Sequence, residues 1–201
     1  MNAMFKRYGG ALLGLALLCV AGAAGWEIWK DYSAKDAARI ATIYLSATRA
    51  AEDPGVTDRA PARADLARVA AEGSATYRTL ARLRLAALAA DAGERDAALS
   101  QWDNVANDSA ADPLLRDVAR LHWAHYQLDA GDPSQIEARL APLTAPGNAL
   151  RPLAEEAQAL LALRQGKPDA ARDTLRRLSQ DVTAPEGVRG RANGLLAQIG
   201  R

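Results

Sequence analysis

The chain has 201 residues, enough for one folded domain and a short appendage. Its charges almost cancel, at a net +1, which excludes the strongly basic surface that nucleic-acid binding requires. Its one cysteine, Cys19, excludes an intrachain disulfide and a thiolate metal cluster. Aromatic residues make up only 5%, and no window alternates apolar and polar residues as a strand does, so we expect an all-α fold.

An uncharged apolar segment lies near the N-terminus. Residues 8–26 are nineteen residues without a charge, close to the ~20 that a helix needs to cross a bilayer. Lys6 and Arg7 precede this segment and the charges that follow it, as far as Asp31, sum to −1, so the N-terminus should stay in the cytoplasm. We therefore expect a single-pass protein of the bacterial inner membrane with three parts: a cytoplasmic N-terminus (1–7), a transmembrane helix (8–29) and a periplasmic domain (30–201).

Two tryptophans stand where this segment would leave the membrane. Trp26 and Trp29 have amphipathic rings that favour the headgroup layer, and we expect them at the membrane interface. A cleaved signal peptide is the alternative, because residues 21–23 form an A-x-A cleavage site; the domain would then be a soluble periplasmic adaptor. In a second alternative, Gly10 and Gly14 pack the span into a membrane complex, and the span itself is the functional part.

The rest of the chain has the pattern of short helices separated by Gly, Pro, Asp and Asn. Breaks such as residues 53–55 and 131–133 each end one helix and start another. The predicted helices are 30–52, 59–72, 75–91, 94–108, 113–130, 133–144, 149–165, 168–181 and 186–199. Because the turns between them are short, these helices should stack as antiparallel neighbours.

A repeat appears when the chain is aligned on the glycines between the predicted helices. Gly93, Gly131 and Gly166 are 38 and 35 residues apart, a period typical of helical solenoids. At constant offsets each glycine is followed by a small or aliphatic residue, a large residue and another apolar residue. These positions are Ala98, Trp102 and Val105; Ile136, Leu140 and Leu143; and Ala171, Leu175 and Leu178. The small residue should let paired helices approach, and the large one should fill the space towards the next pair.

This register resembles the tetratricopeptide repeat (TPR), which has a glycine at the inter-helix turn, alanine five residues later, then an aromatic residue and a proline. The residues that match in one repeat are Gly93, Ala98, Trp102 and Pro113, and the other two repeats follow the pattern more loosely. A small residue of the first helix is kept at Ala86, Ala124 and Ala159, although its aromatic positions are not aromatic. The resemblance implies a TPR-like α-solenoid of helical hairpins over 75–185, with 30–72 leading and 186–199 closing.

Three motifs give the whole chain a narrower resemblance. They are ATYRTLARLRLA from Ala75, PLLRDVARL from Pro113 and ALRPLAEEA from Ala149. Together with the N-terminal segment, they are similar to the TPR-like proteins grouped with the ancillary subunit of the bacterial Sec translocon. That resemblance implies an inner-membrane protein whose periplasmic repeat domain associates with translocon components and with periplasmic chaperones.

Residues with catalytic or ligand-binding chemistry are sparse. His122 and His125 are three residues apart on one predicted helix and could share a metal ion, but only Asp129 lies near enough to be a third ligand. The serines fall at helix starts and loops, where they cap helices. We therefore expect no catalytic, cofactor-binding or metal site, and no small-molecule substrate.

The functional hypothesis is a non-enzymatic interaction scaffold. Stacked helical hairpins offer an extended surface for a partner protein, and the anchor would keep that surface beside the membrane. If the TPR register applies, His125, Asp129 and Arg164 face the groove and are the candidate partner-binding residues.

Overall fold

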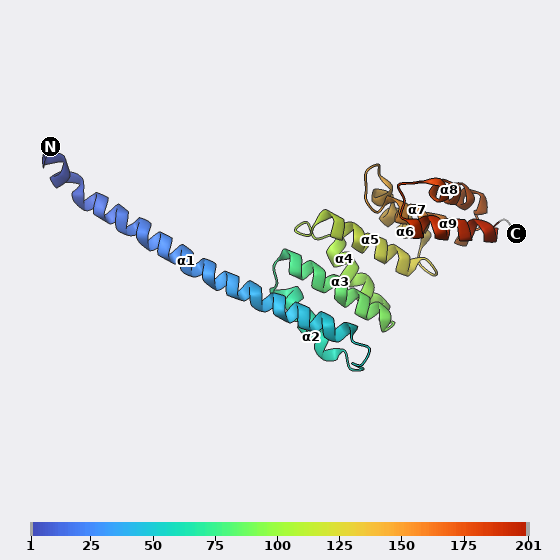
Figure 1. Cartoon of the computed structure of the whole chain (residues 1–201), viewed down its shortest axis with the longest axis horizontal. Coiled ribbons are helices and arrows are strands. Elements are labelled where there is room, and N and C mark those ends of the chain that lie inside the picture. The colour runs from blue at the N-terminus through green and yellow to red at the C-terminus, as the bar shows by residue number, and fades with distance from the viewer. Residues whose placement is uncertain (1, 200–201) are drawn as a thin grey trace.

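The computed structural model describes residues 2–199, and for residues 2–21, 24, 25 and 28 it describes the backbone alone. Within this range the chain forms nine α-helices and one short 3-10 helix, η1 (Figure 1). They are α1 (Asn2–Glu52), α2 (Ala60–Glu72), α3 (Ala75–Asp91), α4 (Arg95–Ala106), α5 (Pro113–Gln127), α6 (Pro133–Leu140), η1 (Ala141–Thr144), α7 (Arg151–Arg164), α8 (Pro168–Gln180) and α9 (Glu186–Ile199). The described residues contain no strand, and the all-α prediction is confirmed.

The first helix is far longer than the others. α1 has 51 residues and, at about 1.5 Å per residue, extends over about 75 Å. No proline interrupts it, because the first proline of the chain, Pro54, comes just after its end. The backbone is therefore continuous across the expected boundary between 8–29 and 30–52. Its C-terminal part packs against α2 and α3, while its N-terminal part projects away from the other helices (Figure 1).

The expected transmembrane segment, 8–29, falls largely on residues whose side chains lie outside the description. Among the side chains that are described, no helix is long and apolar enough to cross a membrane. Trp26 and Trp29 belong to the described part, with exposed fractions of 65% and 60% and ring centroids 5.3 Å apart. Both rings therefore face outward from the helix.

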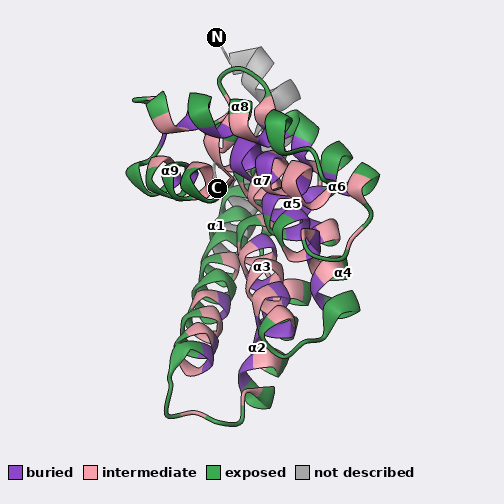
Figure 2. Cartoon of the chain, turned by 90° about the vertical axis from the view of Figure 1, so that its right-hand side faces the viewer, coloured by how far each residue is buried: buried purple, intermediate pink, exposed green. Residues whose placement is uncertain are grey.

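The helices stack in two layers. Each helix packs against the next in the chain, and α1, α3, α5, α7 and α9 also contact one another in that order. These odd-numbered helices form one continuous layer, and each even-numbered helix packs against the odd-numbered helices before and after it (Figure 1). The buried residues gather where the helices face one another (Figure 2). Because alternate helices of an antiparallel stack run in the same direction, the C-terminal ends of the odd-numbered helices point the same way.

The repeat register predicted which side chains are packed. All nine residues at the three offsets after the glycines are at most 5% exposed, and Ala86, Ala124 and Ala159 are at most 1% exposed. The residues of the second offset are Trp102, Leu140 and Leu175, each in a core between one hairpin and the next. These burials confirm the register and the solenoid architecture.

The three glycines of the register serve two different purposes. Gly93 and Gly166 have φ of +75° and +71°, and each ends its helix in a Schellman motif, such as Glu94 N–H donating to Ala89 O at 2.9 Å. Gly131 does not have positive φ; a Cβ there would lie 2.7 Å from the Cβ of Gln127. The first two positions need backbone freedom, whereas the third needs space.

Replacing Gly93 with alanine is expected to lower the free energy of unfolding by about 1 kcal/mol, because the left-handed conformation strains a residue with a Cβ. Gly190, inside α9, has open space around its Cβ position, so alanine there should raise stability by up to about 1 kcal/mol. Urea unfolding followed by circular dichroism measures both changes. Effects of the same sign at the two glycines would contradict this interpretation.

Three predicted helices end two or more residues earlier than expected. The helix predicted over 133–144 changes at Leu140 into η1, because Pro142 has no N–H to continue the α-helical ladder. α4 ends at Ala106 and α5 at Gln127, two and three residues before the predicted ends of 94–108 and 113–130.

Candidate protein-binding groove

Two adjoining hollows lie along the layer of odd-numbered helices, between α3 and α5. One has a volume of about 350 Å³ and the other about 370 Å³. They share Ala87, Trp102 and His122, and together we call them the groove. The first is completed by Tyr44, Leu80, Leu83, Arg84 and Val118, and the second by Ala90, Asp91, His125 and Tyr126.

The helical period explains why these residues share a surface. The lining residues of α3, from Leu80 to Asp91, and those of α5, from Val118 to Tyr126, follow the i, i+3, i+4, i+7 spacing of one helix face. Each helix therefore presents one face to the groove. Residues on its other faces, such as Ala86 of α3 and Ala119 of α5, are buried against neighbouring helices.

Trp102 of α4 forms the floor of the groove. It is only 5% exposed, and its ring lies parallel to that of His122, with centroids 6.0 Å apart and an interplanar angle of 11°. The Tyr126 ring meets Trp102 edge-on at 5.4 Å, and the Arg95 guanidinium lies 5.8 Å from the centre of the Tyr126 ring. The aromatic surface is thus held in a fixed arrangement.

The two histidines are neutral parts of this wall at pH 7. Both side chains are exposed in the groove, but partial desolvation by neighbouring residues lowers the pKa of the His122 imidazole below its ordinary value. Partial desolvation is also the main cause that lowers the pKa of His125, and repulsion from His122 adds to it; Glu156 raises this pKa and Arg191 lowers it. Among the described residues, no group of three or more His, Cys, Asp or Glu side chains could hold a metal ion.

Because these pKa values are lower in the folded chain, the unfolded chain takes up protons first as the pH falls below about 6.5. The stability contributed by neutral histidines is therefore complete above that pH and is lost below it. We expect a lower Tm at pH 5.5 than at pH 7.5, and a smaller difference in the double variant His122→Gln, His125→Gln. An unchanged difference in thermal unfolding would exclude the histidines as its cause.

Two charged residues line the groove. The Arg84 guanidinium forms an ion pair with Glu52 at the end of α1. The Asp91 carboxylate, on the last residue of α3, forms no ion pair with any residue that the structure describes. Since the histidines are neutral, Asp91 gives the groove an unbalanced negative charge.

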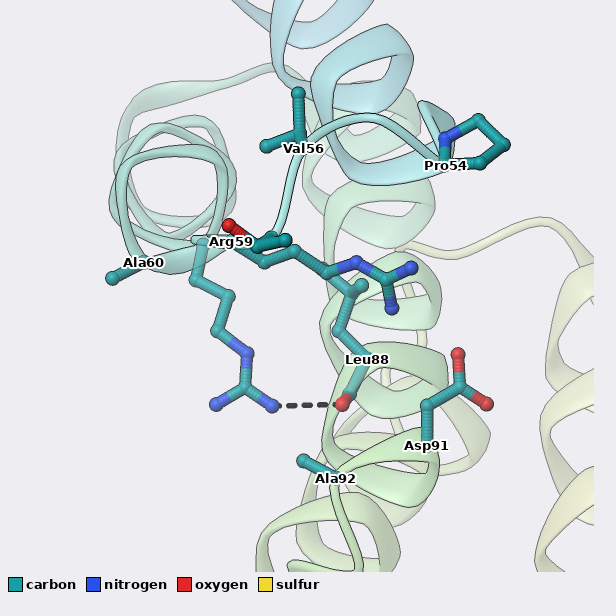
Figure 3. A pocket seen from close by; sticks show the side chains of 9 residues that line it. Pro54, Val56, Arg59, Ala60, Leu88, Asp91 and Ala92 are labelled. Carbon is teal, nitrogen blue, oxygen red and sulfur yellow. Dashed lines mark hydrogen bonds between the residues drawn. The ribbon is translucent and has the colours of Figure 1, made fainter.

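Asp91 also borders a further hollow of about 560 Å³, between the loop after α1, the start of α2 and the end of α3 (Figure 3). There the Arg63 guanidinium donates to Leu88 O at 2.7 Å and pairs with Glu94 at 2.8 Å. Arg59 lines the same hollow without a hydrogen bond or ion pair to Asp91. Arg63 therefore stabilises the packing of α2 against the end of α3. Asp91 lies between this hollow and the groove.

The candidate partner-binding residues occupy different environments. His125 lines the groove, and Asp129 is exposed in the turn that follows α5. The Arg164 guanidinium donates to Leu128 O and Gly131 O, both at 2.7 Å, and to Gln127 O at 3.4 Å. Arg164 thus satisfies carbonyl groups at the C-terminal end of α5 and ties α7 to it.

Arg164 is one of several arginines that join the repeats. Arg120 donates to Ala106 O at 3.1 Å, and Arg78 and Arg82 both reach Asp108, at 3.6 and 3.2 Å. The sequence shows that arginine is abundant, but the identity of each acceptor depends on how the helices pack. These roles therefore cannot be predicted from sequence motifs.

The layered helical hairpins, the register of buried residues and the long apolar groove define a helical-repeat protein. The sequence profile of the tetratricopeptide repeat-like domain matches residues 2–187, and the chain belongs to that family. No curated protein and no solved structure matches the chain. Repeat domains of this kind generally bind proteins on an extended surface. The groove offers a surface of this type, lined by aromatic and aliphatic side chains.

Proposed function

We propose that this protein is a membrane-anchored periplasmic scaffold that binds a segment of a partner protein in the groove between α3 and α5. The observation behind this proposal is the aromatic and aliphatic lining: Tyr44, Leu83, Trp102 and Tyr126 all border the groove. Such side chains dominate the energetics of protein interfaces, and Trp and Tyr are frequent binding hot spots.

The proposed anchor is the segment 8–29, with the N-terminus in the cytoplasm and the repeats in the periplasm. It is supported by the nineteen uncharged residues 8–26, by Lys6 and Arg7 before them, and by the outward-facing rings of Trp26 and Trp29. The scaffold would then act beside the inner membrane.

The proposed partners are components of the Sec translocon and periplasmic chaperones. The motifs from Ala75, Pro113 and Ala149 support this choice through their resemblance to the family of the ancillary translocon subunit. A surface held close to the membrane by a single span suits proteins that receive chains as they emerge from it.

Site-specific photocrosslinking in native membranes tests the groove and its partner together. A photoreactive phenylalanine analogue in place of Tyr44, whose side chain borders the groove and is of similar size, should crosslink to a translocon subunit or a periplasmic chaperone. The control position is Ala170, exposed on α8, where we expect no such product. The same products from both positions, or products from neither, would refute binding in the groove.

Alkaline extraction of membranes and intact-mass analysis test the anchor. A span predicts that the chain stays in the membrane pellet with residues 8–29 present. A mature chain that begins at Ala24 and appears in the soluble fraction would replace the anchor by a released periplasmic adaptor.

A further inference from the structure

We infer that the segment bound in the groove has bulky apolar side chains next to a basic residue, and that the basic residue pairs with Asp91. This inference rests on the proposed function and specifies the chemistry of the partner. It follows from the unequal distribution of apolar and charged groups along the groove.

The hollow that includes Tyr44 accounts for the apolar part. Its walls are Leu80, Leu83 and Val118, its floor is Trp102, and its only charged group, Arg84, is neutralised by Glu52. A charged side chain placed there would lose hydration and meet no opposite charge, whereas a leucine or phenylalanine side chain would bury apolar surface.

The adjoining hollow accounts for the basic residue. Asp91 lies at the C-terminal end of α3, where the helix dipole makes the field negative and disfavours a carboxylate. No ion pair within the described residues offsets this cost. A lysine or arginine of the partner would meet both the carboxylate and the negative helix end.

Three arginines around the end of α3 bear on the strength of this pairing. Arg63 lines the hollow on the other side of Asp91 and is already paired with Glu94 at 2.8 Å. Arg95 lies over Tyr126, but its guanidinium is hydrogen-bonded to the Gln127 side chain and does not line the groove. Arg59 borders the hollow on the other side of Asp91. If a basic residue binds at Asp91, removing the Arg59 charge should strengthen that binding.

Selection from a library of random 12-residue displayed peptides, on the full chain in lipid nanodiscs, tests the inference. We expect enrichment of peptides with two or more bulky apolar residues followed or preceded by lysine or arginine. With Asp91→Asn as bait, the apolar preference should remain and the basic preference should disappear. Enrichment of apolar peptides that are neutral or acidic overturns the inference and leaves the proposed function intact.

Absence of any enrichment relative to a chain with a blocked groove, Ala87→Gln, would count against the proposed function itself. For the most enriched peptide, Asp91→Asn should raise the Kd about three- to fivefold, the range for an exposed ion pair of up to about 1 kcal/mol. Arg59→Gln should lower the Kd. Glu186→Gln, which removes an exposed carboxylate from α9, is the matched control and should leave the Kd unchanged. Equal losses from Asp91→Asn and Glu186→Gln would show a diffuse charge effect and overturn the pairing at Asp91.

Discussion

Replacing Leu140 with alanine is expected to lower the free energy of unfolding by about 3 kcal/mol. The Leu140 side chain is fully buried, and it packs with Ile136 and Leu143 in the core that extends from α3 to α7. α6 has only 8 residues, so few other contacts hold this hairpin in place. The loss should therefore include both the transfer of the side chain and an unfilled cavity.

Urea unfolding of the full chain measures this loss. Leu114→Ala is the matched control, because Leu114 is 49% exposed and its truncation should cost less than about 1 kcal/mol. Hydrogen exchange adds a local measurement: in the Leu140 variant, amides of α6 and η1 should lose protection before those of α3 and α4. Similar losses for the two leucines would mean that α6 is not a packed joint between the repeats.

Replacing Ala87 with glutamine is expected to weaken partner binding at least tenfold. Ala87 is half-buried, and it is the α3 residue that borders both hollows, so a longer side chain there occupies space that the partner needs. Glutamine is a good helix former and is uncharged, so the helix and the field around Asp91 should be preserved. A tenfold change in Kd corresponds to about 1.4 kcal/mol.

Isothermal titration with the most enriched displayed peptide measures the effect, and urea unfolding verifies that the fold is intact. Ala170→Gln makes the same chemical change on the exposed side of α8 and should bind as tightly as the unaltered chain. If Ala87→Gln also bound normally, the peptide would have to lie outside the groove.

The fold could be predicted closely because its determinants are local. Prolines and glycines fixed most helix ends, and a constant offset from each glycine identified packed residues such as Trp102 and Leu175. The offset could not show that Gly131 is needed for space, since that depends on the position of Gln127. Nor could it show that Pro142 converts the end of α6 into a 3-10 turn.

The groove could be predicted only in part. The sequence predicts His125 as a partner-binding candidate, and it lines the groove. It indicates His122 only as a possible metal ligand, whereas the His122 ring stacks on Trp102. No sequence motif points to Asp91 or Tyr44, because each becomes part of the site only when α1, α3 and α5 are side by side. Periodicity locates the apolar stripes of a helix, but tertiary packing decides which stripe stays open.

The uninterrupted α1 helix has a mechanical consequence. Between Trp29 and Ile40, the first buried side chain among the described residues, lie eleven helical steps that rise about 16 Å. No proline lies in this stretch to act as a hinge. In the proposed membrane setting, α1 would transmit the tilt of the span to the repeats as one rigid helix. A change of tilt within the bilayer would then move the repeats sideways. The orientation of the span would therefore determine where the groove meets its partner.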